Sequence, residues 1–245
     1  MKHVQNTGTL FHLPFFSVII TSYNRANLLK RALHALIIQT EKDWEAIVID
    51  DGSTDSTHAQ IMPYLELNNK ITYIRQVSKG CVASKNAGIL LSTGKYITFL
   101  DSDDEFSPDH LATRKAILTE NPAVDFLHGG AKIIGSPYVP DRYDYEQMIH
   151  LRDCAIGGTF FIERKLAFLM KGFADMPLGH DAEFLERVIN SGAAVLKTEL
   201  PTYIYHRETQ NSITNNLTGK KQWYHCSEVI LKGYTSFDQT YENGK

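Results

Sequence analysis

The stretch Tyr96-Ile97-Thr98-Phe99-Leu100-Asp101-Ser102-Asp103-Asp104 places an apolar strand directly before a cluster of carboxylates. Because strand side chains alternate between two faces, Asp101 and Asp103 are expected to point to the same side. Two such carboxylates can share Mg²⁺ or Mn²⁺, whose remaining ligands are then phosphate oxygens. The stretch therefore predicts a buried strand that ends in a diphosphate site. A lone Asp-x-Asp is more often a solvated turn, so its surroundings decide between the two.

Two other phosphate- or cation-binding motifs do not fit. A calcium-binding EF-hand loop starting at Asp101 would need Gly in place of Phe106 and Glu in place of Ala112. Gly88 to Lys95 has one residue too many for a phosphate-binding loop, and it precedes a strand instead of following one. The chain also lacks G-x-G-x-x-G. Neither a Walker ATPase nor a dinucleotide-binding enzyme is supported.

Length and composition favour one α/β domain. The chain has 245 residues, 43% of them hydrophobic, which suffices for one substantial core. A net charge of −3, with no long Lys/Arg cluster, argues against general binding to nucleic acid. Charge gives no further indication of partners.

The chain is expected in the cytoplasm, with the inner face of the cytoplasmic membrane as the alternative. Its first 13 residues do not resemble a secretory signal, and no apolar run is long enough to span a membrane. Cys81, Cys154 and Cys226 are widely spaced, odd in number and without C-x-x-C spacing, which is typical of reduced thiols.

Apolar runs alternate with helix-period segments through the first half of the chain, which predicts a parallel sheet. A helix with Leu29, Leu33 and Leu36 on one face is expected to be capped by Asn24 or Asn27. The second half is less regular, with a loop at residues 135–142 and a loop entering a strand at 155–162. The remaining strands are expected at 15–20, 44–49, 71–74, 96–100, 124–127 and 193–196, and the remaining helices after 51–55 and at 82–91, 108–118, 181–191 and 223–231.

Open α/β sheets bind ligands beyond the carboxyl ends of their strands. Three polar clusters follow predicted strands and are expected at this edge, which we call the rim: residues 21–24, 50–53 and 101–104. The sequence therefore predicts a polar site built from three loops that are far apart in the chain.

Six segments, taken in order, resemble the family 2 glycosyltransferases of the GT-A fold. They are residues 17–24, 49–55, 85–88, 99–104, 172–173 and 179–181. The resemblance implies an α/β fold with a Rossmann-like mixed sheet flanked by helices in a single domain. It further implies a nucleotide-sugar-binding half at 15–104 and an acceptor-binding and catalytic half at 105–214, between an N-terminal extension (1–14) and a C-terminal tail with a helix (215–245).

The resemblance implies a nucleotide site at the rim, where Thr21, Tyr23, Asn24 and Asp51 match the positions that hold the base. A carboxylate accepts the N3–H of uracil and a tyrosine ring offers a stacking face, so uracil is favoured over adenine. The alternative for Asp51, which precedes Gly52, is a turn residue.

The same resemblance implies a diphosphate and metal site. Lys85 matches a basic position that holds the diphosphate, and the alternative for it is a solvated helix face. Asp103 and Asp101 match the ligands of Mn²⁺ or Mg²⁺, with Asp101 also touching ribose. Residues 205–207 and 212–214 resemble a flexible loop that closes over the donor, in which His206 would be a third metal ligand and Arg207 a phosphate contact.

On the acceptor side, Asp181 matches the family's general base. Its alternative is a helix N-cap, the usual role of Asp at such a position. His180 would tune the base, and Gly157 and Gly158 match the segment under the acceptor sugar, where small residues allow close approach.

The expected function is inverting, metal-dependent transfer of a hexosyl or N-acetylhexosaminyl unit from a UDP-sugar to a glycan, lipid-linked or protein-linked acceptor. The absence of Gln-x-x-Arg-Trp favours single addition over processive synthesis. Two alternatives remain: a sugar-nucleotide pyrophosphorylase, and a nucleotide-sugar binding or scaffold module without activity.

Overall fold

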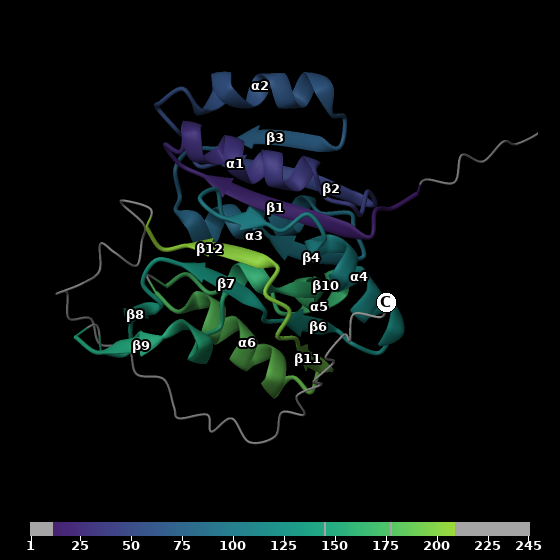
Figure 1. Ribbon diagram of the computed structural model, residues 1–245, viewed down its shortest axis with the longest axis vertical. Helices are drawn as coiled ribbons and strands as arrows, with labels where there is room; N and C mark the ends of the chain where they lie inside the picture. Colours follow the sequence, from purple (N-terminus) through teal and green to yellow (C-terminus); the bar gives the residue numbers. More distant parts are fainter. Residues whose placement is uncertain (1–11, 145, 177, 209–245) are drawn as a thin grey trace, which may run out of the picture.

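A computed structural model describes residues 12–144, 146–176 and 178–208 (Figure 1). The helix expected at 223–231, Cys226, the segment 212–214 and most of the N-terminal extension lie outside these residues.

Strands and helices alternate in the first half, as the sequence pattern predicts. The four strands pair in parallel in the order β4-β1-β2-β3, with Ile19 opposite both Phe99 and Ile47. Their carboxyl ends therefore meet at one edge, the rim. The elements are β1 (Phe16–Ser22), α1 (Ala26–Ile37), β2 (Trp44–Asp50), α2 (Thr57–Leu67), β3 (Ile71–Arg75), α3 (Cys81–Leu91) and β4 (Tyr96–Phe99).

The second half extends this sheet and makes it mixed. The full order is β11-β6-β10-β4-β1-β2-β3, and β10 runs antiparallel to both of its neighbours. The predicted mixed sheet is confirmed. The new elements of this half are α4 (His110–Glu120), β6 (Phe126–His128), the 3-10 turns η1 (Leu151–Asp153) and η2 (Gly157–Thr159), β10 (Phe161–Glu163), α5 (Arg164–Leu169), α6 (His180–Asn190) and β11 (Val195–Lys197).

Two segments expected as loops are strands. Part of the expected loop 205–207 belongs to β12 (Tyr203–His206), which lies between β5 (Glu105–Phe106) and β7 (Ala131–Ile134) in a second, three-stranded sheet. Part of 135–142 forms β8 (Tyr138–Pro140), which pairs with β9 (Met148–His150). Each is only three or four residues long, too short for a clear alternation of apolar and polar residues. The partners of β12 are also about 70 to 100 residues away in the chain, whereas β8 and β9 form a local antiparallel pair.

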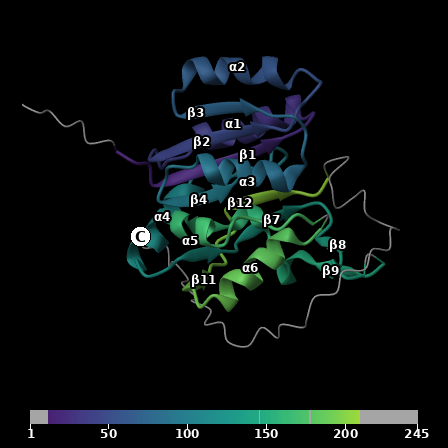
Figure 2. The ribbon, with the colours of Figure 1, turned by 180° about the vertical axis from the view of Figure 1, so that it is seen from behind.

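The main sheet carries a buried apolar layer on each face. Val18 and Ile20 of β1 belong to one layer and Ile19 to the other, as strand alternation requires. Residues of α1, α2 and α4 belong to the first layer and residues of α3, α5 and α6 to the second. Figure 1 shows α1 in front of the sheet, and Figure 2, seen from behind, shows α3, α5 and α6 in front of it. In the part of the chain that the structure describes, no helix is long and apolar enough to span a membrane.

The loops after β1 and β2 are tied together at the rim. Asn24 adopts φ 52° and its Oδ1 accepts hydrogen bonds from the backbone N–H groups of Thr54 (2.8 Å) and Asp55 (3.3 Å). Asp55 Oδ2 accepts the N–H of Ala26 at the start of α1 (3.2 Å). The predicted cap by Asn24 or Asn27 is therefore wrong: a carboxylate from the neighbouring loop satisfies this helix end.

Candidate active site

Asp51 is the central acceptor of the loop between β3 and α3. Its buried carboxylate accepts four hydrogen bonds of 2.8 to 2.9 Å, from the side chains of Gln76 and Ser78 and from the backbone N–H groups of Lys79 and Gly80. Burial alone would raise the pKa of Asp51, but these donors outweigh it and the pKa is lowered. Asp51 therefore positions this loop, and a base N–H would have to compete with donors already bound.

The other residues matched to the base lie around the same loops. The side chain of Tyr23 is among the exposed aromatic groups, with 51% of the residue accessible, so its ring face is available for stacking. Thr21 Oγ1 lies 3.8 Å from Cys81 Sγ at the start of α3. Asn24 connects the rim loops through its own side chain.

The three aspartates after β4 have different environments. Asp104 is fully buried and accepts hydrogen bonds from Tyr203 Oη (2.6 Å) and from the backbone N–H of His206 (2.8 Å). It therefore joins the rim to β12. Asp103 is only partly enclosed, and burial, then the charge of Asp101, raises its pKa. The strand alternation expected to align Asp101 and Asp103 is wrong, because β4 ends at Phe99 and residues 101–104 form a turn closed by the Asp104 N–H to the Asp101 carbonyl (2.9 Å). Asp101 and Asp103, both partly exposed, remain as the two carboxylates that can face a substrate.

His206 and Arg207 are committed to protein partners. The two ring nitrogens of His206 lie 2.8 Å from Glu105 Oε1 and 3.0 Å from Glu208 Oε1. The Arg207 guanidinium donates to the Tyr138 carbonyl at 3.3 Å. Neither side chain is directed at the Asp101–Asp103 pair by these contacts, so the predicted roles would require rearrangement.

Asp101 and Asp103 could supply two carboxylate ligands to a divalent cation. Among residues 12–144, 146–176 and 178–208, no three His, Cys, Asp or Glu side chains cluster closely enough to hold a metal ion. Mg²⁺ and Mn²⁺ nevertheless favour one or two carboxylates together with substrate oxygens. Burial, and then the neighbouring charge of Asp101, raises the pKa of Asp103, and a bound cation would favour the ionised carboxylate.

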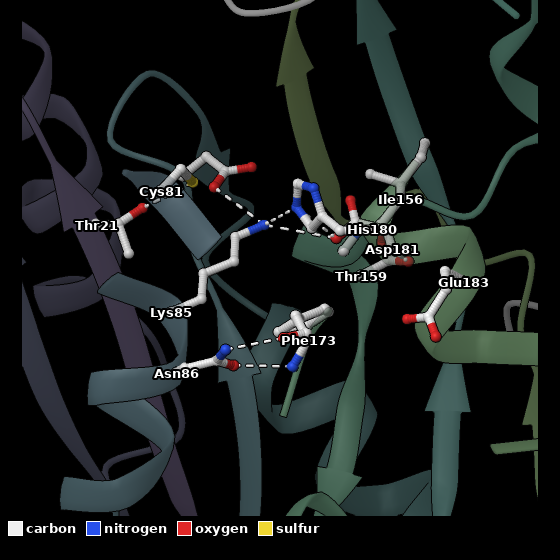
Figure 3. A network of polar contacts seen from close by, with 12 residues as sticks. Thr21, Cys81, Lys85, Asn86, Ile156, Thr159, Phe173, His180, Asp181 and Glu183 are labelled. Atoms are coloured by element: carbon white, nitrogen blue, oxygen red, sulfur yellow. Dashed lines mark hydrogen bonds and ion pairs between the residues drawn. The ribbon is translucent and has the colours of Figure 1, made fainter. Parts of the chain in front are cut away.

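Lys85 lies at the centre of the site, on α3 (Figure 3). Only 4% of its side chain is accessible, and its Nζ lies 3.4 Å from His180 Nε2, 3.6 Å from Asp181 Oδ1 and 3.9 Å from Asp101 Oδ1. Burial would lower the pKa of Lys85, but Asp181 and then Asp101 raise it, so the ammonium stays charged. The alternative of a solvated helix face is wrong.

Asp181 stands in the first turn of α6, but it does not cap this helix. The N-cap is Gly179, with φ 82°, and no side chain of the described residues caps this end. Asp181 Oδ2 instead accepts the backbone N–H of Gly157 at 3.0 Å. Oδ1 faces Lys85 and His180, and it is a buried oxygen for which no well-aligned hydrogen bond is found among the described residues. The alternative of a helix cap is wrong, and one carboxylate oxygen is oriented toward Lys85 and His180.

The charge state of Asp181 follows from the same neighbours. Burial would raise its pKa, but Lys85, then His180 and the N–H of Gly157, lower the pKa well below the usual range of a carboxyl. Asp181 is therefore ionised at neutral pH, as an acceptor of a proton must be.

Gly157 and Gly158 are required by contacts within the protein. A Cβ at Gly157 would lie 2.4 Å from Asp181 Oδ1, and a Cβ at Gly158 would lie 2.2 Å from the ring of Tyr203. The groups that closely approach these glycines are thus Asp181 and Tyr203, and their contact with an acceptor sugar stays a prediction. Gly157 thereby positions the candidate base.

Asn86 stands within a matched segment, but its role is not apparent from the sequence. Its amide donates to the Phe173 carbonyl (2.9 Å) and accepts the Phe173 N–H (2.8 Å), so it fixes the turn before α6 to α3 (Figure 3). The Phe173 ring lies 5.5 Å from Lys85 Nζ and packs edge-on against His180. The joint occurrence of 85–88 and 172–173 among the matched segments is the signal that could have revealed this pair.

The mixed sheet with its polar rim defines a GT-A type fold. The model of the family "Glycosyl transferase family 2" matches residues 17–172, more than half of the chain. The chain therefore belongs to glycosyltransferase family 2.

Three similar proteins illustrate the family and fold. The glucosyltransferase WfgD of Escherichia coli, named for UDP-Glc and α-D-GlcNAc-diphosphoundecaprenol, is 25% identical, and the match covers 94% of this chain and 97% of WfgD. TarS of S. aureus with UDP-GlcNAc gives a TM-score of 0.66 at 20% identity, over 81% of this chain and 60% of TarS. The mannosyltransferase PcManGT of Pyrobaculum calidifontis, with GDP-Man and Mn²⁺, gives 0.65 at 18% identity, over 84% of this chain and 60% of PcManGT. The chain spans less than a fifth of the length of the curated relatives with 38–40% identity.

Proposed function

We propose that the protein transfers a sugar from a UDP-sugar to a hydroxyl of a glycan or glycolipid acceptor, one unit at a time and with inversion. The observation that carries this proposal is the placement of Asp181, whose Oδ1 faces Lys85 while Lys85 also reaches Asp101 at the rim. The buried Lys85 ammonium thus lies next to both the candidate base and the candidate diphosphate site.

In this mechanism residues 15–104 bind the nucleotide. Tyr23 stacks on the base, and Asp51 orders the loop 76–80 beside it. Thr21 and Asn24 complete the rim, and Lys85 meets the diphosphate. A divalent cation held by Asp101 and Asp103 would neutralise the leaving diphosphate. His206 and Arg207 join this site only if they leave their present partners.

Residues 105–214 contribute the acceptor side. The Gly157 N–H holds Asp181 Oδ2, which leaves Oδ1 to take the proton from the acceptor hydroxyl as it attacks the anomeric carbon. A single base on the face opposite the leaving group gives in-line displacement and therefore inversion. His180 lies 3.1 Å from Asp181 Oδ1 and restricts its orientation.

The full-length match to WfgD supports a UDP-sugar donor and an acceptor carried on a lipid diphosphate. Such an acceptor suits a cytoplasmic protein that works at the inner face of the cytoplasmic membrane.

The test is a screen of UDP-, GDP- and dTDP-sugars with Mn²⁺ or Mg²⁺, read first as thermal stabilisation and then as transfer to lipid-diphosphate and free-glycan acceptors. A ligand that binds only the folded protein raises its melting temperature. We expect stabilisation by UDP-sugars that EDTA abolishes, and a product of inverted anomeric configuration by NMR. Stabilisation without transfer to any acceptor would favour a binding module, and metal-independent binding would remove the role of Asp103.

A further inference from the structure

The Lys85 ammonium is shared among its partners instead of bound to one. Charge-assisted N–H···O bonds are about 2.7–2.9 Å long. The distances from Lys85 Nζ to His180, Asp181 and Asp101 are 3.4, 3.6 and 3.9 Å. The rings of Phe99 and Phe173 lie 5.8 and 5.5 Å from the same atom. Among the described residues the ammonium is thus held by charge and by enclosure, with no short hydrogen bond that would fix its position.

A diphosphate at the rim would compete for this cation. Lysine carries one compact charge on a flexible stem, so it can shift toward a new anion where an arginine fork would hold its geometry. Asp101, in the loop after β4, has its Oδ1 3.9 Å from Lys85 Nζ. Asp181 Oδ1, from the first turn of α6, lies 3.6 Å from the same atom (Figure 3). A short movement of the Lys85 ammonium therefore replaces its contact with Asp181 by a contact with a diphosphate at the rim.

This exchange bears on the base. While Lys85 and His180 face Asp181 Oδ1, the carboxylate accepts a proton poorly, because its charge is already compensated. Weakening the contact with Lys85 makes the same oxygen a better acceptor. Oδ2 stays bound to the Gly157 N–H throughout, so the orientation of the group is kept.

We propose that Lys85 couples donor binding to the base: the donor diphosphate draws the ammonium away from Asp181 and thereby releases Asp181 Oδ1 for the acceptor hydroxyl. This inference rests on the proposed function. Coupling between two sites is reciprocal. If the bound diphosphate makes Asp181 a better proton acceptor, then neutralising Asp181 must raise the affinity for the diphosphate. Asp181 competes with the donor for Lys85, so removing its charge tightens nucleotide binding.

The experiment is calorimetric titration of UDP with Mn²⁺ into the full chain and its variants Asp181→Asn, Lys85→Met and the double variant. We expect Asp181→Asn to bind UDP at least about fivefold more tightly than the wild type, the lower end of typical coupling between sites. In the Lys85→Met background the same substitution is expected to change affinity less than twofold.

A charge control separates this coupling from a general loss of negative charge. Glu183 lies two residues further along α6 and pairs with Arg187 at 2.6 Å. Glu183→Gln is expected to leave UDP affinity within twofold, and it serves as the reference if Lys85→Met does not fold.

The outcomes are distinct. Absence of UDP binding to the wild type would overturn the proposed function itself. Three outcomes would overturn the coupling alone. They are an Asp181→Asn variant with no gain in UDP affinity over the wild type, a gain of equal size in Glu183→Gln, and a gain from Asp181→Asn that persists in the Lys85→Met background.

Discussion

Gly157→Ala tests how closely the position of Asp181 is determined. The new Cβ would lie 2.4 Å from Asp181 Oδ1, 2.6 Å from Cγ and 2.7 Å from Oδ2. Ordinary contacts begin at about 3.4 Å, so the carboxylate must retreat by about 1 Å. Misplacement of a catalytic group by about 1 Å can cost about 100-fold in rate. Overpacking a buried site also costs about 1–3 kcal/mol of stability.

We therefore expect Gly157→Ala to lower kcat about 100-fold while UDP affinity stays within a few-fold of the wild type. The matched control is Gly158→Ala, whose Cβ would meet the Tyr203 ring at 2.2 Å instead of the base. It should lose comparable stability by urea unfolding but retain far more activity per folded molecule. Equal kcat losses in the two variants, or a normal kcat in Gly157→Ala, would refute the reasoning.

Three further predictions concern the rim and the core. Asp51→Ala removes the acceptor of four hydrogen bonds, so it should lose about 2–4 kcal/mol of stability together with UDP affinity. Tyr23→Ala should keep its melting temperature and lose only about 1–3 kcal/mol of UDP binding energy. An Asp51→Ala variant that keeps its stability but loses UDP affinity would show that Asp51 binds the base directly. Arg114 is fully buried and donates to the carbonyls of Gly129 and Leu200 (3.1 and 2.9 Å). Arg114→Met should therefore lose about 2–5 kcal/mol of stability, measured by urea unfolding. The control Lys115→Met should lose at most about 1 kcal/mol, because the ion pairs of Lys115 are only partly buried. Burial lowers the pKa of His128 to about 4, below the value of about 6.5 in an unfolded chain. Between these pH values the unfolded state binds more protons, so the free energy of unfolding should fall by up to about 3 kcal/mol from pH 6.5 to pH 4. A His128→Gln variant whose stability falls equally over this pH range would contradict this.

The sequence predicts the first half of the fold well because its signals are local. Each strand from β1 to β3 is followed directly by a helix, as the alternating pattern predicts. The polar residues after Ser22, Asp50 and Phe99 reach the same edge of the sheet as expected. Asp181 and Gly157 are identified by resemblance and do lie together.

The parts that could not be predicted depend on partners far away in the chain. Asp104 is anchored by Tyr203, 99 residues later, and α1 is capped by Asp55 across the rim instead of by a neighbour. Lys85 looks like a surface lysine on its own helix, and only the arrival of Asp181, from the far end of the domain, explains its burial. Local patterns carry no information on such contacts.

The central claim is that Asp181 is the base, and Asp181→Asn tests it most directly. Asn keeps the shape of the side chain but cannot take up a proton, and loss of a general base costs about 10²–10⁴ in rate. With UDP-sugar, Mn²⁺ and an acceptor that the wild type uses, we predict a variant that folds, binds UDP at least as tightly as the wild type and transfers at least about 100-fold more slowly. Transfer at a near-normal rate by this folded, UDP-binding variant would contradict the account.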